Sequence, residues 1–440
     1  MTPVTLFEEL KPALGGAAAV VEADRCLECG GTHAPAPCTV ACPAGIDVPG
    51  FVTAIADGDP ARAAELIFAE NLLGGTCARV CPTELLCEGA CVLVHEGRRP
   101  VDIGRLQRHA ADVGLRAHLP LRRRVATSGF RVAVVGAGPA GLTCAGELAA
   151  RGHDVTVYDE RRETGGLVRY AIAPYRQLAD PLPAETELLR ALGVRIELGR
   201  PVDAERLRRL RVINDAVVLA VGMGADARVH YMGDDLEGVW DSLPFIEAIK
   251  TGRPPRIGPH VVVIGGGNTA VDVAIEAVRL GAESVTMLYR RTEAEMPAYL
   301  HEVELAKAEG VELRLLTAPV RFVGRHRLEA VECVRMQLGE PDESGRARPE
   351  PIPGSEHLVP GETAIKAIGQ EPRRELSEWL DGLAVDADGR VQIDADTGRT
   401  SLAWVYAAGD ATNGGATVVE AVREGKLAAR AVDIDLRRGS

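Results

Sequence analysis

Three features of the sequence predict an α/β protein with a small cysteine-rich helical domain at its N-terminus. Eight of the ten cysteines lie between Cys26 and Cys91. Two segments, residues 131–141 and 261–270, each place a short β-branched run directly before a glycine-rich turn and a helical pattern. Such strand–glycine–helix units build parallel sheets that bind dinucleotides. We therefore expect an α-helical domain followed by two Rossmann-like dinucleotide-binding domains.

Composition narrows the class of protein. The chain has 440 residues, 46% of them hydrophobic, which is enough for two or three packed domains. Its formal net charge is −13, whereas nucleic-acid-binding domains are usually basic, so we expect no nucleic-acid partner. We find no signal-peptide pattern and no apolar run near the ~18–20 residues that span a bilayer, so we expect a cytoplasmic protein without a membrane segment. The one basic stretch, residues 121–124, is predicted to be a solvated linker.

The cysteine block has two halves, separated by an amphipathic stretch, residues 48–71, that predicts two short helices. The halves hold Cys26, Cys29, Cys38 and Cys42, then Cys77, Cys81, Cys87 and Cys91. Zinc knuckles would need paired C-x2-C motifs, but only Cys26 and Cys29 have that spacing. The C-x3-C-P ending at Pro43 is instead typical of ferredoxin-type iron–sulfur loops. We favour two 4Fe-4S clusters over zinc, and zinc over disulfides, which are uncommon in the cytosol.

The first glycine-rich unit carries Gly136, Gly138 and Gly141, with Pro139 and Ala140 between them. The first glycine makes the tight turn, the second lets the backbone approach a pyrophosphate, and the third packs the helix on the strand. The N-terminus of that helix supplies N–H groups to the anion. Asp159 ends the next strand, about 20 residues further on, where an acidic residue binds a ribose hydroxyl.

The second unit has the same form, with Gly265 and Gly267 followed by Asn268 and Thr269. Where the first unit has a carboxylate, this one has Arg290 and Arg291 after its second strand. A carboxylate would repel a 2′-phosphate, whereas an arginine binds it bidentately. The sequence therefore favours NADPH over NADH, although the two arginines could also be a solvated strand end.

Near the C-terminus a predicted strand, residues 404–407, runs into Gly409 and Asp410, and a helix starts at about Thr417. This arrangement resembles the second FAD-contacting motif of flavoproteins with two dinucleotide domains. The resemblance implies that Asp410 binds the FAD and that the helix points its N-terminus at the flavin. Gly166 and Gly369 are predicted as further cofactor contacts. Gly369 lies in residues 363–372, which look like the strand that returns the chain to the FAD domain.

These motifs predict an NAD(P)-binding domain inserted into an FAD-binding domain. The expected segments are residues 1–125 for the double 4Fe-4S domain, 126–255 and 363–440 for the two FAD halves, and 256–362 for the NAD(P) domain. The polar stretch 339–354 is predicted to be a hairpin or loop.

The second cysteine half, with the following VDIGRLQRHA, resembles the N-terminal domain of dihydropyrimidine dehydrogenases. The resemblance implies that one cluster is held by Cys26, Cys29, Cys38 and Cys91, and the other by Cys42, Cys81, Cys87 and the side chain of Gln107. Cys77 would then be unligated, and a rival assignment gives it the place of Gln107. The gap between Cys29 and Cys38 is longer than in that family, and His33 within it is predicted to be an exposed loop residue rather than a substitute ligand.

Two dinucleotide sites and two clusters imply electron transfer from NAD(P)H through FAD to a partner. We assign no catalytic residue, and we expect Glu302 to be solvated on a helix. Disulfide reduction is excluded because it needs a C-x-x-C near the flavin.

Nearly the whole chain resembles the FAD and Fe–S subunit of bacterial NAD(P)-dependent dihydropyrimidine dehydrogenase, with the glutamate synthase small subunit as a near relative. The first resemblance implies a hetero-oligomer with an FMN-containing catalytic subunit, and the spacing of Cys81 and Cys87 together with Gln107 favours it. The alternatives are a glutamate synthase small subunit, an NADPH:ferredoxin-type oxidoreductase, and a non-catalytic Fe–S scaffold or redox sensor.

Overall fold

The computed structural model describes residues 8–31, 34–341 and 345–438. It divides the chain into two compact units. The large unit comprises Leu10–Arg169, Ala179–Met223 and the chain from Pro372 onward, and the small unit comprises Gly224–Glu371 with Tyr170–Leu178 and the two residues before Leu10. The interpretation of His33 concerns a residue that lies outside the described ranges.

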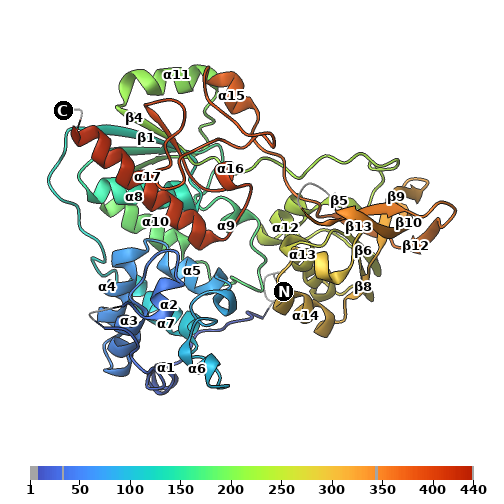
Figure 1. Cartoon of the computed structure of the whole chain (residues 1–440), viewed down its shortest axis with the longest axis horizontal. Coiled ribbons are helices and arrows are strands. Elements are labelled where there is room, and N and C mark those ends of the chain that lie inside the picture. The colour runs from blue at the N-terminus through green and yellow to red at the C-terminus, as the bar shows by residue number, and fades with distance from the viewer. Residues whose placement is uncertain (1–7, 32–33, 342–344, 439–440) are drawn as a thin grey trace. The chain divides into compact units, whose positions relative to one another are not determined.

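The cysteine-rich part of the large unit is helical, as predicted (Figure 1). Its helices are α1 (Gly16–Ala23), α2 (Pro37–Val40), α3 (Val48–Ala56), α4 (Pro60–Glu70), α5 (Gly74–Val80), α6 (Val92–His95) and α7 (Ile103–Arg116). The two helices expected within residues 48–71 are α3 and α4. Each begins with an aspartate cap and a proline in its first turn: Asp47 accepts from Gly50 N–H at 3.2 Å, and Asp59 from Arg62 N–H at 2.9 Å.

The rest of the large unit is a parallel sheet between two layers of helices (Figure 1). Its strands are β1 (Arg131–Val135), β2 (Asp154–Tyr158), β3 (Arg195–Glu197), β4 (Ala216–Leu219) and β14 (Val405–Ala407), in the order β14-β4-β1-β2-β3. Its helices are α8 (Pro139–Ala150), α9 (Leu167–Tyr170), α10 (Leu182–Ala191), α11 (Ala204–Ile213), α15 (Glu375–Trp379), α16 (Asp410–Asn413) and α17 (Val418–Arg438). The order reverses direction at β1, where ligands bind in doubly wound sheets.

The stretch 121–124 is not the solvated linker that its basic composition predicts. Leu121 is buried, and the Arg122 guanidinium donates to both carboxylate oxygens of Glu147 at 2.9 and 3.0 Å. Arg124 donates to the carbonyl of His153 at 3.0 Å. Glu147 lies on α8 and is only 2% exposed, so its charge needs a partner, which the linker supplies.

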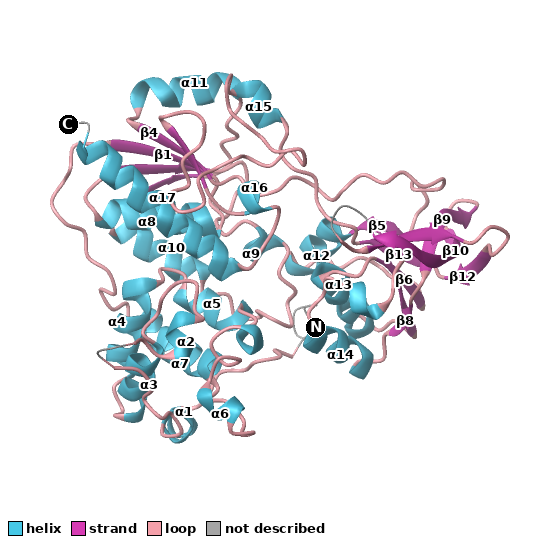
Figure 2. Ribbon diagram, in the orientation of Figure 1, coloured by secondary structure: helices cyan, strands magenta, loops and turns pink. Residues whose placement is uncertain are grey.

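The small unit is built on a second parallel sheet, with helices on one face and an antiparallel sheet on the other (Figure 2). The parallel strands are β5 (Val239–Asp241), β6 (His260–Ile264), β7 (Ser284–Leu288), β8 (Glu312–Arg314) and β13 (Thr363–Lys366), in the order β5-β13-β6-β7-β8. The helices are α12 (Ser242–Lys250), α13 (Asn268–Arg279) and α14 (Leu300–Ala308). The antiparallel strands are β9 (Thr317–Gly324), β10 (Leu328–Pro341), β11 (Ala347–Pro351) and β12 (His357–Pro360), and the pairing of β10 with β11 confirms a hairpin in residues 339–354.

The chain passes between the units at other places than the sequence predicts. The two boundaries of the inserted domain lie between residues 223 and 224 and between 371 and 372, rather than at 255 and 362, and residues 170–178 also belong to the small unit. The reason is strand pairing. Strand β13 pairs with β6 on one side and with β5 on the other. The strands just before and just after the predicted insertion, β5 and β13, therefore both belong to the sheet of the small unit. Residues 363–366 are therefore part of that sheet and do not yet belong to the large unit.

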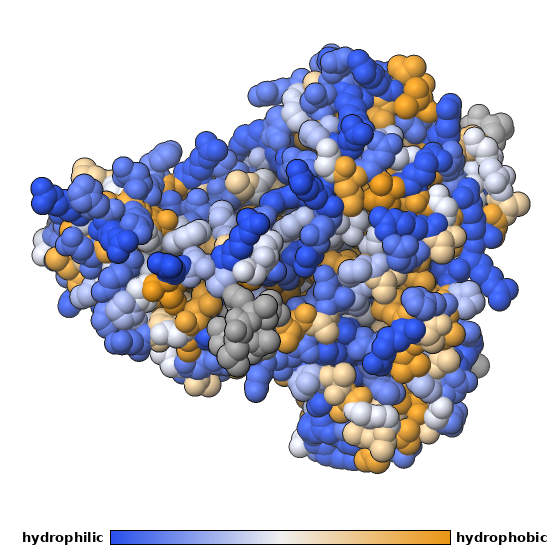
Figure 3. Space-filling view, turned by 180° about the vertical axis from the view of Figure 1, so that it is seen from behind, coloured by the Kyte–Doolittle hydropathy of each residue, from blue (hydrophilic) through white to orange (hydrophobic). Residues whose placement is uncertain are grey.

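The surface of the molecule is largely hydrophilic in the view of Figure 3, with separate hydrophobic patches. None of the described helices is long and apolar enough to cross a membrane. Four exposed hydrophobic side chains of the large unit stand within three positions of a predicted cluster cysteine: Leu27, Val40, Leu85 and Val94. The chain around the cysteines thus offers apolar side chains to the solvent.

Gly425 allows α17 to touch the first turn of α8. A Cβ atom at Gly425 would lie 2.4 Å from the carbonyl oxygen of Ala140. We expect Gly425→Ala to lower the stability of the large unit by about 1–3 kcal/mol, because overpacking forces the backbones apart. Thermal unfolding followed by circular dichroism measures this.

The matched control is Gly16→Ala, where the added methyl group meets nothing within 4 Å on another helix. An unchanged unfolding midpoint for Gly425→Ala would show that α17 and α8 separate without cost.

Candidate functional site

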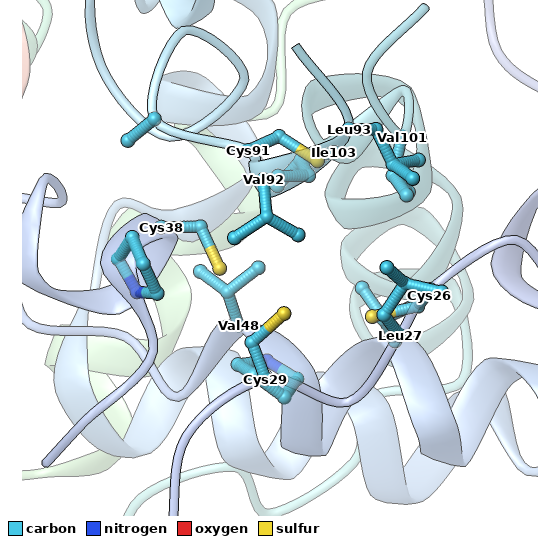
Figure 4. Close-up of a pocket in the computed structure, with 14 residues that line it drawn as sticks. Cys26, Leu27, Cys29, Cys38, Val48, Cys91, Val92, Leu93, Val101 and Ile103 are labelled. Atoms are coloured by element: carbon cyan, nitrogen blue, oxygen red, sulfur yellow. The ribbon is translucent and has the colours of Figure 1, made fainter. Parts of the chain in front are cut away.

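Four of the predicted cluster ligands line one pocket in the large unit: Cys26, Cys29, Cys38 and Cys91. Their sulfur atoms point toward a shared space whose wall includes Val48, Val92 and Ile103 (Figure 4). Burial raises the pKa of the Cys38 thiol to about 11 and also raises that of Cys26. Buried thiolates need a positive charge beside them, which bound iron supplies. The pocket therefore fits a cluster held by four cysteines.

The remaining four cysteines of the block form a second group. The pKa of Cys81 is raised by its contact with the Cys77 thiol, by burial, and by the nearby sulfurs of Cys87 and Cys42. Cys77 lies on α5 and Cys81 directly follows the last residue of that helix, and the backbone N–H of Cys81 donates to the carbonyl of Cys77. No group of three or more His, Cys, Asp or Glu among the described residues has the geometry to hold a single metal ion.

Gln107 lies on α7, which packs against α5. Its side chain is buried, and its Nε2 donates to the carbonyl oxygen of Gly74 at 2.7 Å, at the start of α5. The amide oxygen is the atom left for a metal. The structure thus brings Cys42, Cys77, Cys81 and Cys87 together and places Gln107 against the start of α5, the helix of Cys77.

The first glycine-rich turn has the geometry that a dinucleotide needs. Gly136 has φ +110°, and a Cβ atom there would lie 2.1 Å from the carbonyl oxygen of Ala220. A Cβ atom at Gly141 would lie 2.0 Å from the carbonyl of Gly136, whereas one at Gly138 would meet nothing within 4 Å. The turn therefore packs tightly against the protein backbone at Gly136 and Gly141 and is open at Gly138, where α8 begins. This is the geometry that a pyrophosphate requires.

Two further predicted residues border this turn. Asp159 accepts from the backbone N–H groups of Ala137 at 2.6 Å and Arg161 at 2.7 Å, while burial raises its pKa. Gly166 has φ +52°, and a Cβ atom there would lie 3.0 Å from the Cα of Gly138. The loop after β2 therefore touches the glycine turn itself.

The C-terminal motif reaches the same place from a distant part of the sequence. Gly409 follows β14 with φ +79°, and a Cβ atom there would lie 2.9 Å from the Cβ of Ala140. Asp410 follows directly, and burial raises the pKa of its carboxyl group. Thr417 stands before α17, where its hydroxyl donates to Glu420 at 2.8 Å. Gly136, Gly138, Pro139, Ala140, Gly141, Gly166, Gly409 and Asp410 thus gather around the first turn of α8.

Sequence reasoning missed the residue that holds this C-terminal loop. Glu424, one turn inside α17, accepts from Gly409 N–H at 2.6 Å and from the Asn413 amide at 2.8 Å. The only sequence signal for this contact is the short separation between Gly409 and Glu424, which lets the loop after Gly409 fold back onto α17.

The second glycine-rich turn lies in the small unit and follows the same rules. Gly265 has φ +145°, and a Cβ atom there would lie 2.2 Å from the carbonyl of Ala367, the residue directly after β13. Gly267 is nearly open, with Pro297 at 3.9 Å from an added Cβ. Asn268 begins α13 and accepts from Tyr299 N–H at 2.9 Å, and Thr269 is exposed. These residues leave the start of α13 accessible to a nucleotide.

The two arginines after β7 differ in environment. Arg290 is exposed, whereas Arg291 is 4% exposed and its Nε donates to the carbonyl of Ala347 at 2.8 Å. The exposed guanidinium of Arg290 is therefore the one that is open to a phosphate.

Other residues singled out in the sequence lie elsewhere. Gly369 is exposed in the small unit, with φ +109°. Glu302 is not solvated: it is 5% exposed and forms an ion pair with Arg176 at 2.9 Å. Cys333 is fully buried in the core of the small unit, and Cys144 in that of the large one.

Two family models match the chain. Residues 130–425 match the pyridine nucleotide-disulphide oxidoreductase family. Residues 4–118 match a domain described as dihydropyrimidine dehydrogenase domain II, 4Fe-4S cluster.

Several curated proteins are similar over most of this chain. The NADP(+)-dependent formate dehydrogenase subunit beta of Moorella thermoacetica is 39% identical over 92% of this chain and 60% of its own length. The glutamate synthase (NADPH) small chain of Escherichia coli K12 is 35% identical over 96% of this chain and 92% of its own. The NADPH-Fe(3+) oxidoreductase subunit beta of Geobacter sulfurreducens is 37% identical, and the chain spans 64% of its length.

Solved structures share the fold at lower identity. Mycobacterium tuberculosis FprA in complex with NADPH has a TM-score of 0.57 at 19% identity, covering 70% of this chain and 86% of that one. The thioredoxin reductase of T. acidophilum has a TM-score of 0.52 at 21% identity, covering 70% of this chain and 99% of that one. The likeness confirms the predicted α/β fold with two dinucleotide-binding domains. The chain therefore belongs to the pyridine nucleotide-disulphide oxidoreductase family, as an NAD(P)H-dependent FAD oxidoreductase that carries an N-terminal 4Fe-4S domain.

Proposed function

We propose that the chain is an NADPH-oxidising electron-input subunit that passes electrons through FAD and two 4Fe-4S clusters to a partner protein. The observation that carries this proposal is the presence of both cysteine groups and the first glycine-rich turn in one compact unit. When bound, FAD accepts the two electrons of a hydride and releases them singly to iron–sulfur groups.

The chain's own residues bind and orient these groups. Backbone N–H groups at the start of α8 bind the FAD pyrophosphate beside Gly138. Each Asp159 oxygen accepts one backbone bond, which leaves lone pairs for a ribose hydroxyl. Asp410 lies beside the same turn, held by the loop that Glu424 fixes. In the small unit, Gly267 and Asn268 face the NADPH pyrophosphate and Arg290 its 2′-phosphate.

The partner that we favour is an FMN-containing catalytic subunit of a cytoplasmic dihydropyrimidine dehydrogenase, in a hetero-oligomer. The spacing of Cys81 and Cys87, the position of Gln107 and the match of residues 4–118 support it. The exposed side chains of Leu27, Val40, Leu85 and Val94 suit a protein surface beside the clusters. A glutamate synthase large subunit is the second candidate, because the E. coli small chain matches over 92% of its length.

An anaerobic pull-down from the native cell tests the partner. The co-purifying chain is identified, and NADPH oxidation is measured with uracil, and separately with glutamine and 2-oxoglutarate. Uracil-dependent oxidation with an FMN protein supports the first partner. Glutamate formation with a large amidotransferase chain replaces it with the second. Purified chain that binds FAD and iron but passes no electrons from NADPH to a dye would contradict the electron-input function itself.

Iron content distinguishes the two assignments of the second cluster. We expect Cys81→Ala and Gln107→Leu to lose about half of the bound iron, since one of two clusters loses a ligand. Cys77→Ala should keep all of it. Iron per chain and the electron paramagnetic resonance spectrum of the reduced protein measure this.

The rival assignment predicts the reverse for the last two variants. Full iron in Gln107→Leu together with half in Cys77→Ala would make Cys77 the ligand.

Coenzyme preference tests Arg290. We expect Arg290→Glu to raise KM for NADPH about tenfold while leaving that for NADH nearly unchanged, because a charged hydrogen bond is worth about 1.5–3 kcal/mol. The ratio of kcat/KM for the two coenzymes, with a dye as acceptor, measures this.

Arg325→Glu is the matched control, since Arg325 is an exposed arginine elsewhere in the small unit. Equal effects of the two substitutions would show that Arg290 acts only through general charge.

A further inference from the structure

Helix α5, which carries Cys77 and ends directly before Cys81, begins against a carboxylate from a distant part of the chain. Glu185 of α10 accepts through Oε1 from Gly75 N–H at 2.8 Å and Thr76 N–H at 3.0 Å. Its Oε2 accepts from the Thr76 hydroxyl at 2.5 Å. These bonds satisfy N–H groups that the first turn of a helix leaves without a partner.

Glu185 is a charged residue on the buried, apolar side of its own helix, a position that is unfavourable without hydrogen-bond partners. It is fully buried, on the same stripe of α10 as Leu182 and Leu189, which pack in the core. Burial raises the pKa of Glu185 to about 7, and the bonds from Thr76 and Gly75 oppose the rise. A carboxylate in such a position is costly unless it is hydrogen-bonded. The three side-chain hydrogen bonds that Glu185 forms with described residues all go to α5.

A second contact ties α5 to the same region. The Arg79 guanidinium, 6% exposed as a residue, donates from Nε to the carbonyl of Ala179 at 2.9 Å, just before α10. Its Nη2 donates to Asp112 of α7 at 2.7 Å. Gly75 permits the close approach, since a Cβ atom there would lie 3.2 Å from that of Pro181. α5 is thus bound both to α10 and to α7, the helix of Gln107.

The buried side of α10 also touches the loop of the FAD turn. The hydroxyl of Thr186, the residue after Glu185, lies 2.8 Å from that of Thr164. A Cβ atom at Gly165 would lie 2.5 Å from the Leu182 side chain, and the next residue, Gly166, approaches the Cα of Gly138. Helix α10 therefore contacts both the loop beside the FAD turn and the start of α5.

We propose that Glu185 is a positioning residue: through Thr76 and Gly75 it holds the cysteine-bearing helix α5 at a set distance from the FAD-binding turn. The inference rests on the proposed function, because it concerns the transfer of electrons between the two sites. It assigns a role in that transfer to a residue that touches neither cofactor.

Three variants and a control test the role. Glu185→Ala removes all three bonds, and Thr76→Val removes only the bond to Oε2 and keeps the two N–H bonds to Oε1. Glu185→Gln keeps the shape, with its amide oxygen accepting from the two N–H groups and its amide nitrogen donating to the Thr76 hydroxyl. The control is Glu187→Ala on the same helix, since the Glu187 side chain is 67% exposed and is paired with Arg190.

The first readout is hydrogen–deuterium exchange of residues 74–81. We expect exchange at Gly75 and Thr76 to rise about tenfold or more in Glu185→Ala, since the donors lose their partner. The second readout separates two steps after rapid mixing with NADPH. Flavin bleaching should keep the wild-type rate, whereas the cluster signal in electron paramagnetic resonance should appear about tenfold later, because small displacements between reacting groups cost rate steeply. Glu185→Gln should restore both, and Glu187→Ala should change neither.

Each outcome decides the role. Faster exchange with an unchanged delay between flavin and cluster reduction would overturn it and leave Glu185 a packing residue. Wild-type exchange in both Glu185→Ala and Thr76→Val would overturn it as well. If Glu185→Ala fails to fold, Thr76→Val and Glu185→Gln carry the same comparison. Wild-type protein without iron would instead refute the proposed function, while the exchange experiment still reports on the contact.

Discussion

The first turn of α8 is the point on which the large unit depends. Three segments meet around this turn in contacts that only glycine permits: the glycine turn at Gly136 and Gly141, the loop at Gly409, and α17 at Gly425. These segments come from opposite ends of the flavin-binding sequence. A side chain at any of these positions would separate them, because it would meet main-chain atoms or the Ala140 side chain within 3 Å. The same absence of side chains leaves the turn open at Gly138, where we propose that a pyrophosphate binds.

Buried charged side chains also hold distant segments of the chain together. Glu147 binds the linker arginine Arg122, and Glu185 binds the start of α5, so each carboxylate joins segments that are distant in sequence. In the small unit Arg176 joins Asp272 of α13 to Glu302 of α14. Because a buried charge is costly without its partner, each pair favours one arrangement of its elements over others. Burial raises the pKa of Glu276 well above its usual value instead, which favours its neutral form.

The division into units assigns different tasks to each. The large unit contains both cysteine groups and the glycine turn of the FAD type, and the small unit contains the turn and arginine pair of the NADPH type. Electrons that enter a flavin in the large unit can reach a cluster without leaving it. The exposed apolar side chains near the cysteines lie in the same unit. Under the proposed function, a partner protein would accept the electrons at that surface.

The sequence alone predicts the features that depend on residues close together in the chain. Glycine spacing after β-branched runs determined both turns, and cysteine spacing determined the iron–sulfur character of the N-terminal domain. The tertiary structure decided what depends on partners far away in the chain. Arg122 in the stretch 121–124 is bound to Glu147 and is not solvated, and Glu302 is buried against Arg176. Strand β13 belongs to the small unit because it pairs with β6. The tertiary structure also gave Glu185 its partner on α5, more than a hundred residues earlier. A carboxylate on an apolar helical stripe was the only local sign of that contact, because sequence patterns record which side chains are buried but not which ones meet.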